Sequence, residues 1–510
     1  MVENLTFSWL YASMVQDELL NELSELYSQH YGIWGPCQPI LAGRQIKLSP
    51  ERIREWLQDP DAAVYYAALE DRIIGYAIAV RKKIRNYGVV SWVTQLVVHK
   101  DYRNQDVAKR LLFSIWGLSD DFAWGILSAN PYAVRALEKS TRRRSIPMRI
   151  HRNIRKIMEV GSHSLPYINK DTEYKVDDGN SRVNTKFFID HSDIPDMLEK
   201  VISQETPWKL GDLPEGWEWI AFTFHDQEQI NLSRLELEEM VNTSDEIAKQ
   251  AYARMQLNNQ PWMRNTDAEV CFILRECGLK QGMRLIDFGC GIGRHSNAIS
   301  TYGIQVVGVD YVESNIATAK RKAIPDTNIK FLEADCRFIE LGECDAAICL
   351  YDVIGSFVQL DDNQKIINNI AKHLKIGGIA IISVMNFELT AKRAKHKFSF
   401  LKEPNELLKL SPSTIMEHTG DVFQEDFMMV DEKTQIIYRR EQFIEGRCLP
   451  KELLVRDRRF TMDEIASMCE KAGLQVLFSR YVSAANWDRP LCATDDHAKE
   501  ILLKCRKVEN

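Results

Sequence analysis

The spacing of apolar residues divides the chain into two regions of different character. In the first region, apolar runs predict strands over 5–12, 63–69, 73–80, 89–98 and 124–128 and near 186–189 and 217–224. From residue 283 onward, strands alternate regularly with helices, near 283–288, 305–309, 329–332, 345–350 and 378–384. Regular strand–helix alternation indicates a parallel sheet with helices on both faces. Residues 231–250 read as a helical connector between the two regions.

The composition is that of an ordinary globular protein with more than one domain. Of 510 residues, 45% are hydrophobic and 27% are charged, and the formal net charge of −7 gives no overall attraction to nucleic acid. Apolar runs such as 376–384 are far shorter than the roughly 20 residues that cross a bilayer, and the basic start of a signal peptide is missing. Ten of the eleven cysteines follow residue 270, without a C-x-x-C pair, which predicts buried reduced thiols in the cytoplasm and neither a disulfide framework nor a metal site.

The most informative segment is the turn D-x-G-x-G-x-G from Asp287 to Gly293. It follows a predicted strand and precedes a helix, where glycines let the backbone approach a ligand closely. A dinucleotide-binding loop needs G-x-G-x-x-G, and Arg294 occupies the place of its last glycine, which disfavours NAD. Asp310 ends the next strand, where it suits the hydroxyls of a ribose, and Asp335 ends the following one, where it suits an adenine amino group. These positions predict a site for a nucleoside without a pyrophosphate.

Residues 251–510 therefore resemble the class I S-adenosylmethionine-dependent methyltransferases. The resemblance implies a Rossmann-like fold with a β insertion, near residues 421–455, that roofs a substrate pocket. It also implies that S-adenosylmethionine contacts Asp287, Gly289, Gly291, Gly293, Asp310, Asp335, Cys336 and Leu350.

The segment after the predicted strand 345–350 carries the candidate catalytic residues, Tyr351 and Asp352. DNA amino-methyltransferases have an Asn/Asp-Pro-Pro-aromatic tetrad there, and this chain has Leu-Tyr-Asp-Val without proline, which argues against DNA as the acceptor. The segment resembles small-molecule methyltransferases instead, which implies substrate contacts at Trp262, Arg264 and Arg459. Ordinary packing or a solvated charge is the alternative for each of these three.

Residues 93–108 resemble the acyl-CoA loop of the GNAT N-acetyltransferases, whose pattern is Arg/Gln-x-x-Gly-x-Gly/Ala. Arg103 and Ala108 match this pattern, whereas Asp106 replaces its first glycine. Leu137 stands where the family often has a tyrosine that acts as general acid, so an active enzyme and a degenerate module both stay open. The resemblance implies a mixed α+β fold and acyl-CoA contacts at Leu96, Val98, Arg103, Ala108 and Asn130.

The predicted organisation is a GNAT-like domain over 1–230, with its core in 1–160 and its sheet completed by 228, the connector 231–250, and a methyltransferase domain over 251–510. One interpretation is a cytoplasmic bifunctional enzyme that methylates a small metabolite and N-acetylates the same or a related one, with acetyl-CoA as a second cofactor. In another, the GNAT-like half is a non-catalytic binding or homodimerisation module. In the third, the chain modifies RNA or protein and docks through the basic run 139–156, whose eight Lys and Arg residues otherwise form a solvated face.

Overall fold

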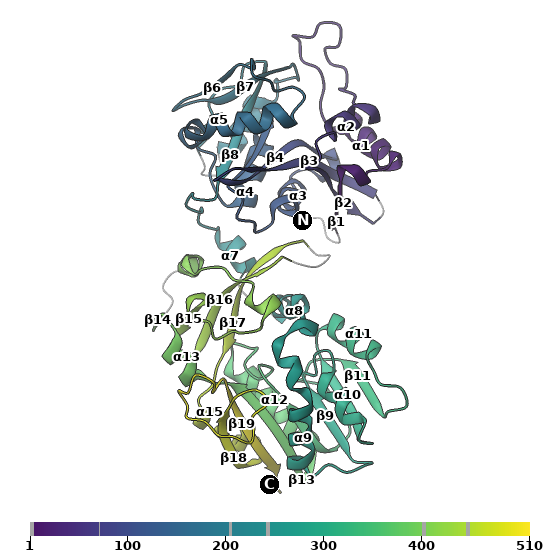
Figure 1. Cartoon of the computed structure of the whole chain (residues 1–510), viewed down its shortest axis with the longest axis vertical. Coiled ribbons are helices and arrows are strands. Elements are labelled where there is room, and N and C mark those ends of the chain that lie inside the picture. The colour runs from purple at the N-terminus through teal and green to yellow at the C-terminus, as the bar shows by residue number, and fades with distance from the viewer. Residues whose placement is uncertain are drawn as a thin grey trace. The chain divides into compact units, whose positions relative to one another are not determined.

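The computed structural model describes residues 5–70, 72–202, 207–240, 245–399, 404–444 and 449–509. The chain divides into two compact units, one of residues up to Asn231 together with 444–451 and one of residues 232–443 with 452–510 (Figure 1). Among the helices within these ranges, none has the length and apolar character that a membrane crossing requires.

The N-terminal unit is built on an eight-stranded sheet with the strand order β1-β2-β3-β4-β5-β8-β7-β6. Its strands are β1 (Leu5–Tyr11), β2 (Ala62–Leu69), β3 (Arg72–Ile84), β4 (Gly88–Val98), β5 (Ala123–Ser128), β6 (Tyr174–Val176), β7 (Ser181–Phe187) and β8 (Gly216–Phe224). Neighbouring strands run antiparallel, except that β4 and β5 pair in parallel over 90–93 and 123–126. Beyond Val93, β4 continues without β5, so the sheet opens between these two strands.

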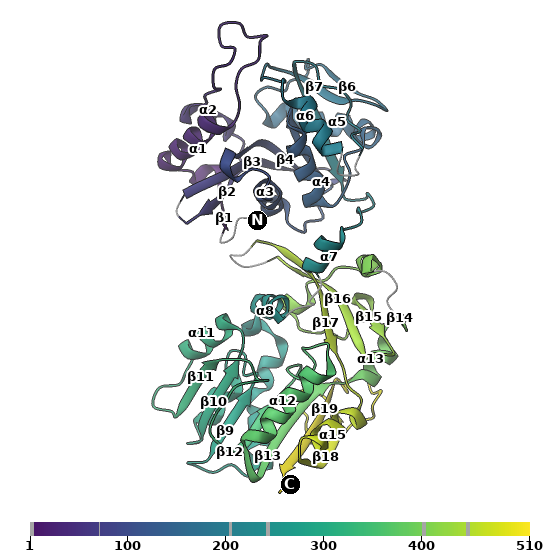
Figure 2. The same ribbon diagram turned by 180° about the vertical axis from the view of Figure 1, so that it is seen from behind.

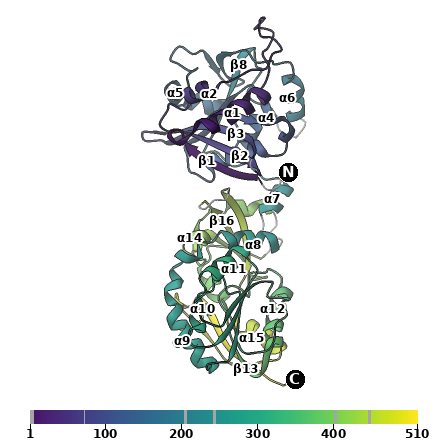
Figure 3. The same ribbon diagram turned by 90° about the vertical axis from the view of Figure 1, so that its right-hand side faces the viewer.

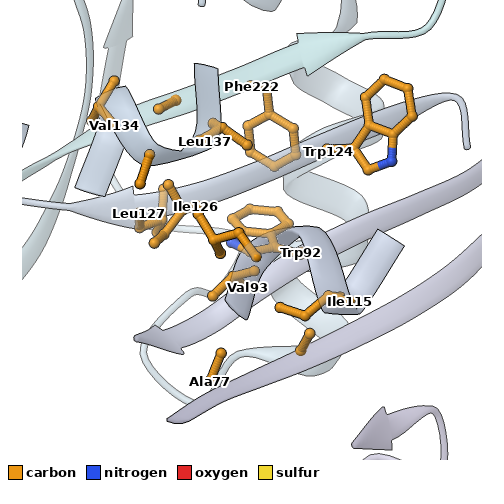
Figure 4. Close-up of a cluster of buried hydrophobic side chains, with 14 of the residues drawn as sticks. Ala77, Trp92, Val93, Ile115, Trp124, Ile126, Leu127, Val134, Leu137 and Phe222 are labelled. Carbon is orange, nitrogen blue, oxygen red and sulfur yellow. The ribbon is translucent and has the colours of Figure 1, made fainter. Parts of the chain in front are cut away.

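Helices cover this sheet and bury its apolar side chains. They are α1 (Asp17–His30), α2 (Pro50–Trp56), α3 (Val107–Trp116), α4 (Pro131–Thr141), α5 (Pro147–Ser164) and α6 (Ile194–Ile202). The largest core joins Trp92 and Phe222 to residues of α3, α4 and α5 (Figure 4). The Phe222 ring lies directly on Gly125 of β5, where an added Cβ would come within 2.1 Å of it, so this contact requires glycine.

The C-terminal unit contains a seven-stranded sheet with the order β11-β10-β9-β12-β13-β19-β18. Its strands are β9 (Arg284–Phe288), β10 (Gln305–Asp310), β11 (Ile329–Glu333), β12 (Cys344–Cys349), β13 (Leu374–Met385), β18 (Leu474–Val482) and β19 (Glu500–Lys507). Strands β9 to β13 pair in parallel, whereas β19 runs antiparallel to β13 and to β18. The strand order reverses between β9 and β12, which is the place where open α/β sheets bind ligands.

Helices pack on both faces of this sheet, as Figure 3 shows most clearly. In Figure 1, the helices toward the viewer are α9 (Thr266–Cys277), α10 (Arg294–Ser300) and α11 (Glu313–Arg321). In Figure 2, which shows the opposite side, the helices toward the viewer are α12 (Leu360–His373) and α15 (Met462–Lys471). The remaining helices are α7 (Arg234–Met240), α8 (Asp245–Arg254), α13 (Phe387–Arg393) and α14 (Ile415–His418). Six of the ten described cysteines are buried, as predicted for thiols in apolar runs, and all ten are free.

A four-stranded sheet is inserted before α15, as expected for a β insertion. It contains β14 (His396–Phe398), β15 (Met428–Asp431), β16 (Ile436–Phe443) and β17 (Lys451–Arg458). The stretch 231–250, expected to be a connector, groups with this unit from Leu232 onward. Leu232 and Leu237 are buried against Tyr438 and Leu454 of the insertion, because the apolar side of α7 needs a core to cover it.

Candidate active site

A cavity of about 720 Å³ opens at the edge of the sheet where the parallel strands of the C-terminal unit end. The turns after β9, β10, β11 and β12 all reach it, since the carboxyl ends of parallel strands lie at one edge. Ten of the residues predicted from the sequence line it: Trp262, Asp287, Gly289, Gly291, Asp310, Asp335, Cys336, Leu350, Tyr351 and Asp352.

The three glycines of the turn after β9 differ in what surrounds them. Gly289, Gly291 and Gly293 all have positive φ, at 79°, 54° and 77°. An added Cβ would lie 2.2 Å from the Val353 side chain at Gly289 and 2.6 Å from the Phe331 ring at Gly293. At Gly291 it would meet only a leucine methyl at 3.7 Å, so Gly291 is the position where the backbone is open to a ligand. Gly293 does not line the cavity and instead allows α10 to pack on β11.

Asp310 is fixed by backbone donors and keeps acceptor capacity toward the cavity. Its carboxylate accepts the N–H groups of Gly291 and Val312, both at 2.9 Å. Burial raises the pKa of Asp310, and these two hydrogen bonds oppose that rise by stabilising the charged form. A carboxylate has about four acceptor positions, and the Asn315 side chain also hydrogen-bonds to this one, so capacity remains for a ribose hydroxyl group.

Asp335 and Cys336 form the next part of the wall. The Asp335 carboxylate accepts two donors of the Arg337 guanidinium, at 2.7 and 3.1 Å, and the Arg337 backbone N–H at 2.8 Å. These contacts orient the carboxylate. Burial raises the pKa of the Cys336 thiol, so this side chain presents a neutral, apolar surface suited to an adenine ring.

Asp287 plays a different part from Asp310, although both line the cavity. Its carboxylate accepts the Ser296 hydroxyl at 2.6 Å, which ties the end of β9 to α10. Burial raises the pKa of Asp287 to about 7. Together, the open backbone at Gly291, the acceptors on Asp310 and the neutral wall at Cys336 fit the nucleoside part of S-adenosylmethionine.

Tyr351 lies at the other end of the cavity in a constrained conformation. Its φ is 66°, which a non-glycine residue rarely adopts, and its backbone N–H donates to Ser383 Oγ at 2.6 Å. Its hydroxyl donates to Glu269 at 2.5 Å. Burial and the carboxylates of Glu500 and Glu269 raise the pKa of Tyr351, so the phenol stays protonated and acts as a donor.

A buried ionic network supports Tyr351 from behind. Glu269 lies 2.7 Å from both Arg294 Nη1 and His295 Nε2. The Arg294 guanidinium also lies over the rings of Trp262 and Tyr351, at 5.2 and 5.1 Å from their centroids. Burial and the positive charge of Arg294 lower the pKa of His295 to about 4, so its imidazole is neutral and has a packing role.

Asp352, the second candidate catalytic residue, is half-buried. It accepts a hydrogen bond from the Tyr252 hydroxyl at 3.3 Å. Burial and the neighbouring Asp457 carboxylate raise its pKa, which makes it a group that could hold a proton.

The two arginines expected at the substrate do not line the cavity. Arg264 is exposed and does not line the cavity. Arg459 is fully buried and lies behind the wall, where it donates to the Val422 carbonyl at 2.7 Å and to the Thr390 hydroxyl at 2.6 Å. Its guanidinium also covers the Phe423 ring. Arg459 therefore holds the segment that roofs the cavity. The sequence motif around Arg459 could not reveal that its side chain does not line the cavity.

Sequence reasoning missed Glu269, Arg294 and Glu500. Arg294 directly follows the glycine turn, so its position next to the site could have been inferred from the motif. Glu269 is in α9, which precedes the first strand of the seven-stranded sheet. Glu500 begins β19, an antiparallel strand near the end of the chain. Only the strand order brings Glu500 to the edge where the parallel strands end.

The candidate acyl-CoA loop of the N-terminal unit follows β4 and opens α3. Asp106, in place of the family's glycine, has a φ of 62°, so the turn adopts the left-handed conformation that glycine would allow. Arg103 donates to the backbone carbonyls of Val98, at 3.3 Å, and of His30. The side chain that would supply positive charge to a ligand is thus engaged within the protein.

The other predicted acyl-CoA contacts lie around the opening between β4 and β5. Leu96 and Val98 are half-buried on β4, Ala108 is in the first turn of α3, and Asn130 caps α4 by accepting the Tyr132 N–H at 2.9 Å. Gln95 accepts the Tyr76 hydroxyl at 2.6 Å. The backbone scaffold of the loop is present, but its charges differ from those expected for a pyrophosphate site.

Most of the basic run 139–156 forms the end of α4 and the first half of α5. Arg143 is buried, stacks over Trp124 and donates to the carbonyls of Thr141 and His225. Arg144 pairs with Glu138 at 3.1 Å and Arg149 with Asp226 at 2.8 Å. Several of its positive charges therefore have partners within the N-terminal unit. Docking of RNA through this run stays a prediction.

Comparisons with known proteins agree with both sequence resemblances. Residues 20–139 match the model of the acetyltransferase (GNAT) family, and residues 285–378 match a methyltransferase domain model. The ubiquinone biosynthesis O-methyltransferase of Rickettsia typhi is 34% identical over 106 residues, which are 20% of this chain and 42% of that protein. The malonyl-[acyl-carrier protein] O-methyltransferase of Bacillus anthracis is 25% identical over 178 residues, 32% of this chain and 64% of that protein.

The chain thus covers less than half of the Rickettsia protein's length. Among solved structures, the CcbJ methyltransferase from Streptomyces caelestis is similar over 49% of this chain and 91% of its own, with 14% identity and a TM-score of 0.37.

Proposed function

Since the chain joins a GNAT-family domain to a methyltransferase domain, we propose that its C-terminal unit transfers a methyl group from S-adenosylmethionine to a small molecule. The observation that carries this proposal is a single cavity lined both by the nucleoside-binding candidates Gly291 and Asp310 and by the acceptor-side candidates Tyr351 and Asp352.

S-adenosylmethionine, when bound, supplies an electrophilic methyl group on a positively charged sulfur. The chain's contribution is to align the acceptor and to exclude water, which can account for a large part of the rate of such a displacement. Gly291, Asp310 and Asp335 would hold the nucleoside. The hydrogen bond from the Tyr351 hydroxyl to Glu269 holds the tyrosine side chain in place, so Tyr351 would position the acceptor. Asp352 would hold or accept a proton.

A roofed cavity favours a small acceptor over a large polymer. Met416, Gly420, Val422 and Phe423, which lie between β14 and β15 of the insertion, all line the cavity. Gln260 and Arg459 fix this segment through the carbonyls of Glu417 and Val422. The two relatives named above are O-methyltransferases of ubiquinone biosynthesis and of malonyl-[acyl-carrier protein], which also supports a metabolite-sized acceptor group.

Replacement of Asp310 by alanine tests this proposal directly. We expect Asp310→Ala to weaken S-adenosylmethionine binding by about 1–3 kcal/mol in a calorimetric titration of the full chain, because charge-assisted hydrogen bonds to the ribose are lost. Glu470→Gln, which removes an exposed acidic charge on α15, serves as the control and should bind normally. A wild-type chain that does not bind S-adenosylmethionine would refute the proposed function.

For the N-terminal unit, acetyl transfer from acetyl-CoA and a non-catalytic binding role remain the two proposals. The left-handed turn at Asp106 supports the first, since it keeps the loop in a form that could cradle a ligand. The engaged Arg103 and the Asp106 carboxylate support the second, because both reduce attraction for an anion. Titration with acetyl-CoA separates them: binding favours transfer, and no binding at millimolar concentration favours the non-catalytic role.

A further inference from the structure

Glu500 brings a carboxyl group to the cavity from the last strand of the sheet. It begins β19 and is paired with Met385 at the end of β13 and with Val482 at the end of β18. Because β19 runs antiparallel to β13, its first residue lies at the edge where the parallel strands end. The side chain is 2% exposed and lines the same cavity as Tyr351 and Asp352.

This carboxyl group is not satisfied by the protein itself. Its Oε2 atom is buried and has no hydrogen-bond partner in the part of the chain that the structure describes. A buried carboxyl oxygen without a donor is costly, and that cost is recovered when a ligand supplies the donor. Burial and the Glu269 carboxylate raise the pKa of Glu500 to about 8, Asp352 adds to the rise, and the Ser383 hydroxyl and Arg294 oppose it.

The cations at this end of the cavity each contact another acid, although the buried Nη2 atom of Arg294 has no hydrogen-bond partner among the described residues. Arg294 contacts Glu269 at 2.7 Å, Arg439 contacts Glu441 at 3.0 Å, and Lys499 contacts Asp421 at 2.7 Å. None of these cations forms an ion pair or hydrogen bond with Glu500 or Asp352 among the described residues, although Arg294 opposes the raised pKa of Glu500 and Arg439 that of Asp352. A direct partner for the Glu500 carboxyl group is therefore left to a ligand.

Aromatic rings form much of the remaining wall. Those that line the cavity are Tyr252, Trp262, Tyr311, Tyr351, Phe357 and Phe423. Protein cations already lie over five of these rings, those of Trp262, Tyr311, Tyr351, Phe357 and Phe423. The rings therefore supply mainly apolar surface, and the selection of a cationic group depends on the Glu500 carboxyl.

We propose that the methyl acceptor is an amine, and that Glu500 binds it as an ammonium group and then removes its proton. This inference rests on the proposed methyl transfer and specifies its substrate class. The Glu500 carboxylate takes one proton from the ammonium nitrogen, which frees the nitrogen lone pair. A nitrogen–carbon bond then forms to the methyl group as the carbon–sulfur bond breaks, and the electrons of that bond remain on sulfur. The products are a neutral thioether and a positively charged N-methyl ammonium group.

A pair of probes that differ only in the polar group tests this assignment. The full chain, saturated with S-adenosylhomocysteine, is titrated calorimetrically with benzylamine and with benzyl alcohol. We expect the amine to bind at least tenfold more tightly than the alcohol, because hydrogen bonds to charged groups contribute about twice as much as neutral ones. Equal affinity for the two probes, or no binding of the amine at millimolar concentration, would overturn the proposal without any variant being needed.

Glu500→Gln identifies the residue responsible. The amide has nearly the same shape but cannot accept a proton, so we expect amine affinity to fall about tenfold and alcohol affinity to stay unchanged. Glu470→Gln is the matched control and should retain the amine preference.

The unpaired carboxyl could instead bind the α-ammonium group of the cofactor, and S-adenosylmethionine affinity distinguishes that source. A loss of cofactor affinity in Glu500→Gln, with amine preference retained, would overturn the assignment. If S-adenosylmethionine does not bind the wild-type chain at all, the proposed function itself fails. If it binds but amines are not preferred, only the acceptor class is wrong.

Discussion

The turn after β9 and the turn after β4 have the same architecture and different side chains. Each follows a strand and opens a helix, and each contains residues with positive φ: Gly289, Gly291 and Gly293 in one, Asn104 and Asp106 in the other. The glycine turn has a backbone position open to a ligand, and its neighbouring carboxylate, Asp310, accepts two backbone N–H donors. The other turn keeps the backbone conformation but carries a carboxylate where the family has no side chain. A motif can therefore lose its charge pattern while its fold is retained.

Buried carboxyl groups extend this comparison to both units. Asp310 in the C-terminal unit accepts two backbone donors. Glu218 on β8 of the N-terminal unit is also buried, and burial raises its pKa to about 7. Burial raises the pKa of both groups, and the backbone donors at Asp310 oppose that rise.

The largest effect is expected at Gly293, where backbone conformation and packing both require glycine. In Gly293→Ala, the new Cβ would approach the Phe331 ring to 2.6 Å at a φ of 77°. We expect a loss of about 2–4 kcal/mol in the unfolding free energy, measured by denaturant titration followed through the C-terminal unit. Gly278→Ala, which has a similar φ but open space around it, separates the two causes. An equal loss in both variants would mean that the contact with Phe331 is unimportant.

An intermediate effect is expected at Glu218 as the pH changes. Because the pKa of Glu218 is raised in the folded protein, the folded state binds more protons than the unfolded state between about pH 4.5 and 7. This group therefore lowers stability as the pH rises through that window. The thermal midpoint of Glu218→Gln should rise relative to wild type from pH 4.5 to 7 in calorimetric scans.

Glu199→Gln, an exposed position on α6, is the control for that series and should show a constant difference from wild type. A constant difference for Glu218→Gln as well would contradict the assignment of a raised pKa to this carboxyl group.

The smallest effect is expected at Asp106, where only charge should change. Asparagine tolerates the left-handed conformation, so Asp106→Asn keeps the turn and removes the carboxylate. We expect acetyl-CoA to bind about three- to tenfold more tightly than to wild type, since a repulsion near its phosphates is removed. The measurement is a calorimetric titration, with Asp101→Asn, an exposed acid in the same loop, as control. No difference between Asp106→Asn and wild type would show that this charge does not limit binding.

Much of the fold was predictable because local patterns specify it. The alternation after residue 283 predicted the five parallel strands to within a few residues, and the glycine turn together with Asp310 and Asp335 indicated one shared edge. Arg264 and Arg459 show the limit of such reasoning. Both are arginines near a motif, yet one is exposed and the other is buried behind the roof, and sequence spacing does not specify the direction of a side chain.

The sequence by itself determined the two fold classes, the ligand-facing turn and the strand ends that surround it, because these depend on local periodicity and on glycine's conformational freedom. Only the tertiary structure decided that Glu500 joins this site, that Tyr351 is held by Glu269 and that Arg103 is engaged by backbone carbonyls. Those contacts join residues far apart in the chain. They depend on strand order and packing, which no local pattern encodes.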